Sequence, residues 1–426
     1  MIQADLVIEG AAELLTLRGT STRPRRGEEM RDLGIIRQGA LAARRGKIVW
    51  VGTTADLLTS VRPMAFAKLI DAYGKTVMPG LVDPHTHVVF AGSRENEFAM
   101  RIQGKTYQEI AAAGGGINAT VAATRKAGRQ ELKVAAKKSL DRMLTLGTTS
   151  AEAKSGYGLE LTTELKMLEV IRELTEEGPM TVVPTFMGAH EIPPEFRQNP
   201  EAYVDLVITR MIPEVAARKL ARFCDVFCEA GVFSVEQSER IFRAAAAAGL
   251  EARVHADELT DLGGAAMAAQ IKARTADHLL YASDDGIRQM AAAGVIAVLL
   301  PGTAYFLNLQ RYARARDMIA AGVPVALATD FNPGSCMTES TPLIMNIACT
   351  QMRMLPAEAI TAATINAAWA IGEEDCAGSL EVGKQADVLI LDAPSHEHLC
   401  YHFGVNLVDT VVKNGKVVVE GGQRVR

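Results

Sequence analysis

The chain has 426 residues, 48% of them hydrophobic, and its 45 basic and 50 acidic side chains give a formal net charge of −5. This length and composition allow a large buried core and two or three domains. Because basic and acidic residues are mixed and nearly balanced, the chain lacks the electrostatic footprint of a protein that binds nucleic acid or an anionic membrane, and we expect a small-molecule substrate.

The chain carries no sequence signal for export or membrane insertion. Its first ten residues have no basic region followed by an apolar core, and apolar runs elsewhere are shorter than the roughly 18 residues of a membrane span. Scattered cysteines in a long chain are typical of reduced thiols. We therefore expect a cytoplasmic protein. The six cysteines are Cys224, Cys228, Cys336, Cys349, Cys376 and Cys400.

The N-terminal part predicts β-strands at 4–9 and 39–51, rich in branched residues and separated by turn residues. The C-terminal end has the same pattern at 386–392 and 410–419, with Lys413-Asn414-Gly415-Lys416 as a tight turn. We expect one small composite β-sandwich domain built from residues 1–79 and 383–426, with residues 80–382 inserted between them.

The inserted part repeats one unit, an amphipathic helix, a terminating glycine and a short strand rich in branched residues. The terminating glycines are Gly147, Gly178, Gly249, Gly294 and Gly322. The expected strands are 77–87, 148–154, 181–186, 223–229, 251–255, 276–281, 295–300 and 324–329. About eight strands are what a closed (β/α)8 TIM barrel requires, so the predicted fold class is α/β.

The first expected barrel strand carries His85-Thr86-His87. Side chains two apart on a strand point to the same side, with Cα atoms about 6.6 Å apart, so two imidazoles can converge on one metal ion. The motif alone is weak, since two ordinary polar histidines would look the same. His396-Glu397-His398 has this spacing without a strand pattern and lies near Pro394, and we interpret it as a solvated loop.

Three further polar residues fall at the ends of expected strands: His255, His278 and Asp330. Taken one at a time, His255 and His278 are as well explained as structural histidines, and Asp330 as a residue that caps the next turn. In a barrel, however, the carboxyl ends of the strands face one shared mouth, where active sites of this fold lie. Together with His85 and His87 these residues predict a metal site at that mouth.

This pattern resembles the amidohydrolase superfamily, which has His-x-His on the first strand, histidines on the fifth and sixth, and aspartate on the eighth. Longer motifs, spread from the first strand to the last residues, resemble the imidazolonepropionase family within it. These motifs are Val77–His87, Phe90–Arg94, Lys154–Gly158, Gly188–His190, His255–Glu258, Ala328–Ser335 and Tyr401–Gly404.

The resemblance implies one metal ion per chain and a metal-activated water as nucleophile. Nitrogen and oxygen ligands without thiolate suit zinc or iron. The implied metal ligands are His85, His87, His255 and Asp330, and the implied catalytic residues are Glu258, His278 and Asp330. Binuclear relatives use a lysine on the fourth strand. Residues 223–229 have none, so we expect a single metal, although Glu229 could support a second.

The resemblance also implies the reaction, hydrolysis of the ring amide of 4-imidazolone-5-propanoate to N-formimidoyl-L-glutamate in histidine degradation. Glu258 would act as general base and then as general acid. The alternative is that Glu258 is an ordinary carboxylate facing solvent. Arg94 would bind the substrate carboxylate, and the alternative is an ordinary surface arginine. For Asn332-Pro333-Gly334 the alternative to substrate binding is a simple turn. The implied substrate-binding residues are Arg94, Tyr157, His190, Glu258, Asn332, Gly334 and Ser335.

Two other functions remain open at this stage. A cytosine- or guanine-type deaminase would use the same ligands but release ammonia. A non-catalytic barrel scaffold would have lost ligand residues, whereas all five metal-site positions are filled. A homodimer is typical of the resembled family.

Overall fold

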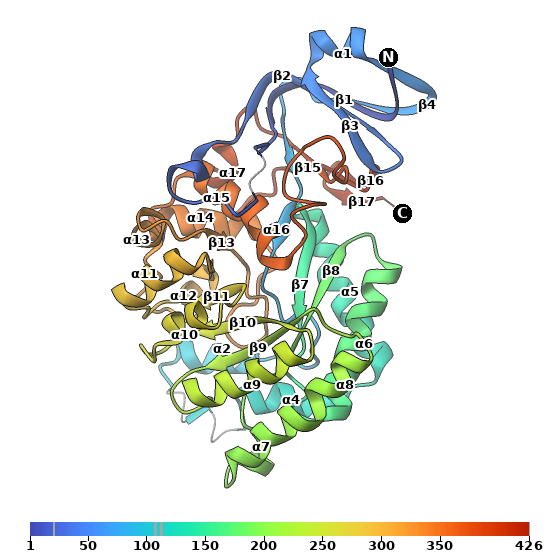
Figure 1. The fold of residues 1–426 in the computed structure, drawn as a ribbon. Coiled ribbons are helices and arrows are strands. Elements are labelled where there is room, and N and C mark those ends of the chain that lie inside the picture. Colours follow the sequence, from blue (N-terminus) through green and yellow to red (C-terminus); the bar gives the residue numbers. More distant parts are fainter. Residues whose placement is uncertain (20–21, 106–108, 111–113, 426) are drawn as a thin grey trace.

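The computed structural model describes residues 1–19, 22–105, 109–110 and 114–425, and it contains two sheets. One has eight strands in chain order from β6 to β13, every neighbouring pair parallel, with helices packed around it (Figure 1). The other has nine strands drawn from both chain ends. The predicted α/β barrel with a composite terminal β-structure is confirmed.

The barrel strands are β6 (Leu81–Asp83), β7 (Thr148–Lys154), β8 (Thr181–Ala189), β9 (Phe223–Cys228), β10 (Glu251–Ala256), β11 (Thr275–His278), β12 (Ile296–Leu299) and β13 (Val325–Leu327). The helices are α1 (Thr54–Ser60), α2 (Glu95–Ile102), α4 (Ile117–Lys126), α5 (Arg129–Thr145), α6 (Leu161–Glu177), α7 (Pro200–Leu206), α8 (Ile212–Ala217), α9 (Val235–Ala247), α10 (Gly264–Gln270), α11 (Asp284–Ala293), α12 (Pro301–Phe306), α13 (Ala315–Ala320), α14 (Thr341–Met352), α15 (Pro356–Ala362), α16 (Ile365–Ile371) and α17 (His398–Tyr401). Across the described residues, none of these is long and apolar enough to span a bilayer.

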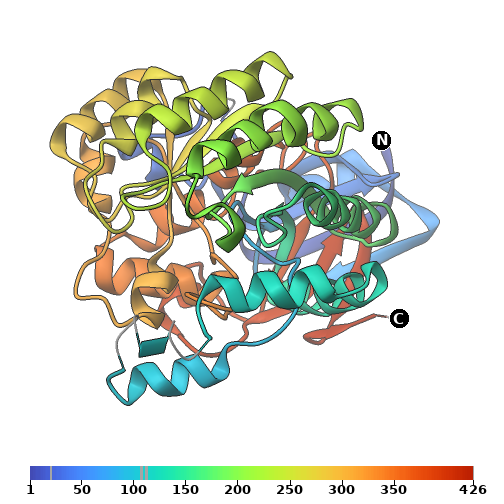
Figure 2. The same ribbon diagram turned by 90° about the horizontal axis from the view of Figure 1, so that it is seen from below.

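The terminal sheet joins the two ends of the chain, and both termini lie on the same side of the molecule (Figures 1 and 2). Its strands are β1 (Ile2–Leu15), β2 (Ile35–Arg44), β3 (Lys47–Thr53), β4 (Val61–Asp71), β5 (Thr76–Pro79), β14 (Val388–Leu391), β15 (Val408–Lys413), β16 (Lys416–Glu420) and β17 (Gln423–Arg424). The junction is β5, which pairs with β1 on one side and β14 on the other. The division into domains at residues 80 and 383 stays a prediction.

The expected single strand at 77–87 is wrong, because it is two strands of different sheets. β5 ends at Pro79 and β6 ends at Asp83. Gly80 lies between them, where a Cβ atom would come within 2.2 Å of the Thr149 hydroxyl oxygen. Pro84 has no N–H to continue the ladder after β6. His85 and His87 therefore follow the first barrel strand and do not lie on it.

One end of the barrel is closed by apolar packing. Ala367 and Ala368 of α16 belong to the same buried cluster as Phe223 at the start of β9 and Val298 of β12. Helices α2 and α4 lie at the other end of the barrel, away from the terminal sheet (Figure 1). Because apolar side chains fill the barrel interior at the α16 end, a ligand reaches the interior from the carboxyl ends of the strands.

Candidate active site

The His85–His87 segment closes the barrel. The N–H of Asp330 donates to the carbonyl of His85 at 3.1 Å, and the N–H of His87 donates to the carbonyl of Phe331 at 3.0 Å. Thr86 and Phe331 form an isolated parallel bridge. The first and last strands of the sheet thus meet through the residues that carry the predicted ligands.

Five predicted metal-site residues converge at this seam, and all are buried. The ring centroid of His85 lies 5.4 Å from that of His87, 4.5 Å from that of His255 and 5.5 Å from that of His278. Two overlapping groups have ligand atoms within 4.8 Å of one another. The first is His85, His87 and His255, and the second is His85, His278 and Asp330.

Two carboxylates orient two of the imidazoles. Nδ1 of His85 lies 2.6 Å from Asp277 Oδ2, and Nδ1 of His255 lies 3.0 Å from Asp225 Oδ1. Because a carboxylate only accepts, Nδ1 carries the proton in the neutral form of each ring, and Nε2 then offers a lone pair. Each Nε2 is buried without a hydrogen-bond partner in the protein. Unpartnered nitrogens that face one another fit a metal ion.

The two oxygens of the Asp330 carboxyl group face different neighbours. Oδ2 accepts hydrogen bonds from the hydroxyls of Thr303 at 2.6 Å and Ser335 at 3.3 Å. Oδ1 lies 3.5 Å from His85 Nε2 and 3.6 Å from His87 Nε2. Asp330 also has a positive φ of 53°, a conformation that is strained for a non-glycine residue and recurs at functional sites.

Burial sets the protonation of the histidines. It lowers the pKa of His85, His87 and His278 well below the usual value, so these rings are neutral near pH 7. Burial acts the same way on His255, but the Asp225 carboxylate outweighs it and raises the pKa. Neutral imidazoles are the form that binds a metal.

A fully buried ionic layer lies inside the barrel beneath the imidazoles. Lys154 Nζ contacts Glu152 at 2.8 Å and Asp225 at 2.7 Å. Arg253 contacts Asp277 at 3.2 Å. Because alternate residues of a strand face the same side, Asp225 of β9 and Arg253 of β10 point into the barrel with His255. This layer fixes the two aspartates that hold His85 and His255.

Glu258 lies in the loop after β10, with one carboxylate oxygen 3.5 Å from His278 Nδ1. Burial, and next the nearby Asp330, raises the pKa of Glu258 to about 8. The loop is held by Glu229, whose carboxylate accepts the Leu259 N–H at 2.8 Å and the Thr260 hydroxyl. Glu229 therefore positions the Glu258 loop and is in neither group of candidate ligands that faces the barrel mouth.

All predicted substrate-binding residues line one cavity of about 420 Å³ at the barrel mouth. The ring of His190 stacks on that of His87 at 5.0 Å, and His190 Nδ1 donates to the Gly156 carbonyl at 3.0 Å. The neighbouring Tyr157 lies in a loop whose Gly156, Gly158 and Leu159 N–H groups all donate to the buried carboxylate of Glu164.

Two of these residues also have structural partners. Arg94 forms a two-bond ion pair with Glu97, at 3.0 Å from Nε and 2.8 Å from Nη2. The Asn332 amide oxygen accepts the N–H groups of Gly334 and Ser335, each at 2.8 Å, so the turn expected from the sequence is present. Both residues still line the cavity.

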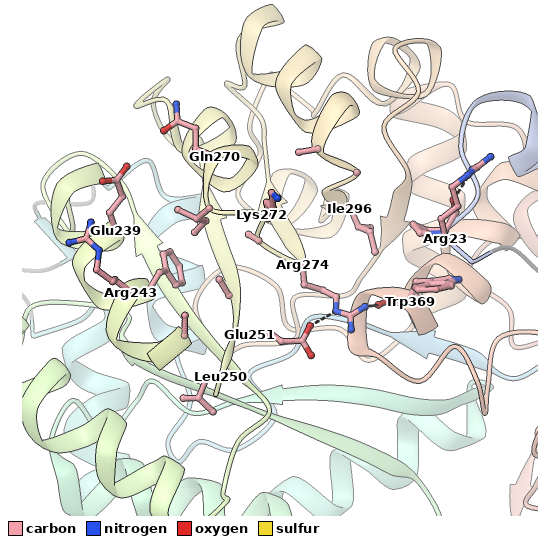
Figure 3. A pocket seen from close by; sticks show the side chains of 18 of the residues that line it. Arg23, Glu239, Arg243, Leu250, Glu251, Gln270, Lys272, Arg274, Ile296 and Trp369 are labelled. Carbon is pink, nitrogen blue, oxygen red and sulfur yellow. Dashed lines mark hydrogen bonds and ion pairs between the residues drawn. The ribbon is translucent and has the colours of Figure 1, made fainter. Parts of the chain in front are cut away.

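A larger cavity, of about 760 Å³, contains none of the predicted site residues (Figure 3). Its lining includes Glu251 and Ile296, the first residues of β10 and β12, so it lies at the opposite ends of the strands from His255. There Arg274 is bonded to Glu251 at 2.9 Å and to the Trp369 carbonyl at 3.1 Å. Size alone therefore does not identify the site.

Sequence reasoning missed Asp225, Asp277 and Thr303. Asp277 precedes His278 in β11 and pairs in register with His255, and Asp225 shares the inward side of β9. The signal was strand alternation and register, which place both carboxylates on the inward side of the barrel with His255. Thr303 lies in a different segment, α12, and no local sequence pattern indicates that it contacts the site.

Comparisons with known proteins agree with this geometry. The model of the family described as "Amidohydrolase family" matches residues 76–418. The chain is 54% identical over 424 residues to the imidazolonepropionase of Symbiobacterium thermophilum, covering 99% of each chain. It is 55% identical over 417 residues to that of Brevibacillus brevis, covering 98% of each.

Solved structures share the fold at low identity. A zinc-bound adenosine deaminase from Xanthomonas campestris superimposes with a TM-score of 0.72 at 18% identity, over 100% of this chain and 95% of that chain. The 5-methylcytosine deaminase of Klebsiella pneumoniae gives 0.73 at 17% identity, over 99% of both. These likenesses show the barrel fold alone.

Proposed function

We infer that this chain, which belongs to the amidohydrolase family and within it to the imidazolonepropionases, hydrolyses the ring amide of 4-imidazolone-5-propanoate to N-formimidoyl-L-glutamate. The observation that carries this assignment is identity of 51 to 55% with imidazolonepropionases over nearly the whole chain. The bond broken is a carbon–nitrogen bond in a cyclic amide, and the enzyme is a hydrolase.

We propose that His85, His87, His255 and Asp330 hold one zinc or iron ion. The two unpartnered Nε2 atoms, and the Asp330 oxygen that lies 3.5 Å from one of them, support this ligand set. When bound, the ion polarises the ring carbonyl, lowers the pKa of a water molecule and favours the ionised form of Glu258. The choice between the two metals stays open to measurement.

We propose that Glu258 moves the protons of the reaction. Its carboxylate lies at the cavity wall and is more basic than an exposed glutamate, which suits a group that takes a proton from water. The same oxygen would then give that proton to the leaving ring nitrogen. His278, 3.5 Å away and neutral, would donate to the carbonyl oxygen as negative charge develops there.

The other residues that line the cavity would bind the substrate. Tyr157 and His190 form an aromatic wall beside His87, which suits a flat five-membered ring. Arg94, Asn332, Gly334 and Ser335 supply polar groups for the carboxylate arm. The homodimer and the cytoplasmic location stay predictions.

The assignment is tested with purified, metal-loaded protein and freshly made imidazolone propanoate. Loss of the substrate's absorbance and appearance of N-formimidoyl-L-glutamate are the expected results. Ammonia is measured in the same reaction, since a cytosine- or guanine-type deaminase would release it. No product above the uncatalysed rate would refute the assignment.

A further inference from the structure

Three cationic side chains line the cavity on the side of α2: Arg94, Arg101 and Lys105. Arg94 and Arg101 are seven residues apart, two helical turns, so they lie on one face of the helix. Two of the three are paired with acids. Arg94 is bonded to Glu97, and Lys105 contacts Glu109 at 3.1 Å in an exposed position.

The charge of Arg94 is neutralised by Glu97. The two carboxylate oxygens take the Nε and Nη2 edge of the guanidinium, and Glu97 Oε1 also accepts the Gly116 N–H at 3.0 Å. The remaining Nη1 lies against Gly334, where a Cβ atom would come within 2.2 Å of it. Arg94 therefore offers a ligand hydrogen bonds without a net positive charge.

Arg101 is held in a different way. Its guanidinium carbon lies 5.1 Å from the centre of the Phe306 ring and 6.0 Å from that of Phe98, and these rings stack at 5.2 Å. Within the described parts of the chain, its guanidinium has no ion pair and no hydrogen bond. Aromatic faces fix a cation without using its N–H donors or cancelling its charge. Burial and the nearby Arg94 lower the pKa of Arg101, but a guanidinium stays protonated.

We propose that Arg101 binds the propanoate carboxylate of the substrate together with Arg94, and that it thereby determines the preference for an acidic substrate. This inference rests on the proposed function. Hydrolysis turns the ring carbonyl into a second carboxylate, so the product carries one more carboxylate than the substrate. The Arg94–Glu97 pair is neutral as a unit, and Arg101 is the unpaired cation beside it.

The test compares Arg101→Gln with the matched control Lys105→Gln, which removes the same charge from the same side of the cavity at an exposed, already paired position. For Arg101→Gln we expect KM to rise about 10- to 100-fold with kcat within about threefold of the parent protein, because a charge-assisted contact is lost. Lys105→Gln should keep KM within about twofold, and Arg101→Lys should recover part of the loss.

A neutral analogue, with a carboxamide in place of the propanoate carboxylate, gives a readout that a structural role would not change. The parent protein and Arg101→Gln should process it with equal kcat/KM. An unchanged KM for the acid, or an equal loss on both compounds, overturns the inference. If the parent protein does not turn over the imidazolone, the proposed function fails. Calorimetric binding of N-formyl-L-glutamate then still tests the role of Arg101. We expect Arg101→Gln to bind this compound about 10- to 100-fold more weakly than the parent protein does.

Discussion

Two His-x-His segments, His85–His87 and His396–His398, have identical spacing and different surroundings. By proximity alone both qualify as metal sites, since Glu13, His396 and Glu397 also have ligand atoms within 4.8 Å of one another. At the barrel mouth the facing nitrogens have no partner in the protein. At the terminal sheet, Glu13 and His396 are hydrogen-bonded to each other.

Glu13 is the reason for this difference. One of its oxygens accepts hydrogen bonds from the backbone N–H and Nδ1 of His396, at 2.9 and 2.8 Å, and the other pairs with Arg37 at 2.9 Å. Glu397 is exposed. The interpretation of this segment as a solvated loop is wrong, because the His396 ring is hydrogen-bonded to a buried glutamate and His398 begins α17. A metal centre is therefore distinguished by converging lone pairs that the protein leaves unused.

The largest effect is expected from removing a ligand at the mouth. Asp330→Ala and His255→Ala should each lower bound metal to below about one tenth of an ion per chain and activity by about 10³-fold or more, because the ion's stabilisation of charge is lost. Metal analysis and steady-state kinetics measure this. His398→Ala is the control, and full metal occupancy in either mouth variant would contradict the ligand set.

Removing the proton carrier should separate metal binding from turnover. Glu258→Gln keeps the shape of the side chain but cannot accept a proton, so we expect bound metal to be unchanged and kcat to fall about 10²- to 10⁴-fold. Glu191→Gln, which alters another carboxylate lining the same cavity, is the matched control. Full activity in Glu258→Gln would remove its acid–base role.

A smaller effect is expected at a carboxylate that orients one of the ligands. Asp277→Asn should weaken metal affinity about 10- to 100-fold, measured by competition with a chelator, because an amide no longer holds His85 in one tautomer. Asp387→Asn changes a buried aspartate paired with Lys413 in the terminal sheet and should leave the affinity as it was. Equal affinities in the two variants would mean that Asp277 does not orient His85.

The smallest effects are expected at the second His-x-His segment. His396→Ala should leave metal content unchanged but lower the free energy of unfolding by about 1 to 3 kcal/mol, because the buried Glu13 loses hydrogen bonds. His398→Ala, where the ring contacts Ser395 at 3.1 Å, should change it by less than about 0.5 kcal/mol. Urea titration measures both, and loss of metal from His396→Ala would show that the comparison is wrong.

Most barrel strands could be predicted because their signal is local. Branched residues after a terminating glycine identified β7 at its observed bounds and β10 within one residue. β4 was missed, since it pairs with β1 outside the main strand order and is largely exposed, so it has no clear alternation of buried and exposed residues. The break of the 77–87 strand into β5 and β6 at Gly80 was missed, because it depends on the close approach of Thr149 from another strand.

The sequence by itself determined which ligand types the chain carries and their order along the barrel, because side-chain chemistry and strand periodicity are properties of short segments. Only the tertiary structure decided that the lone pairs of His85 and His255 are free, since Asp277, which fixes His85, is 192 residues away. It also decided that Arg94 is neutralised by Glu97 while Arg101 keeps its charge. Whether a polar group is available for chemistry depends on what every other packed segment has already bonded.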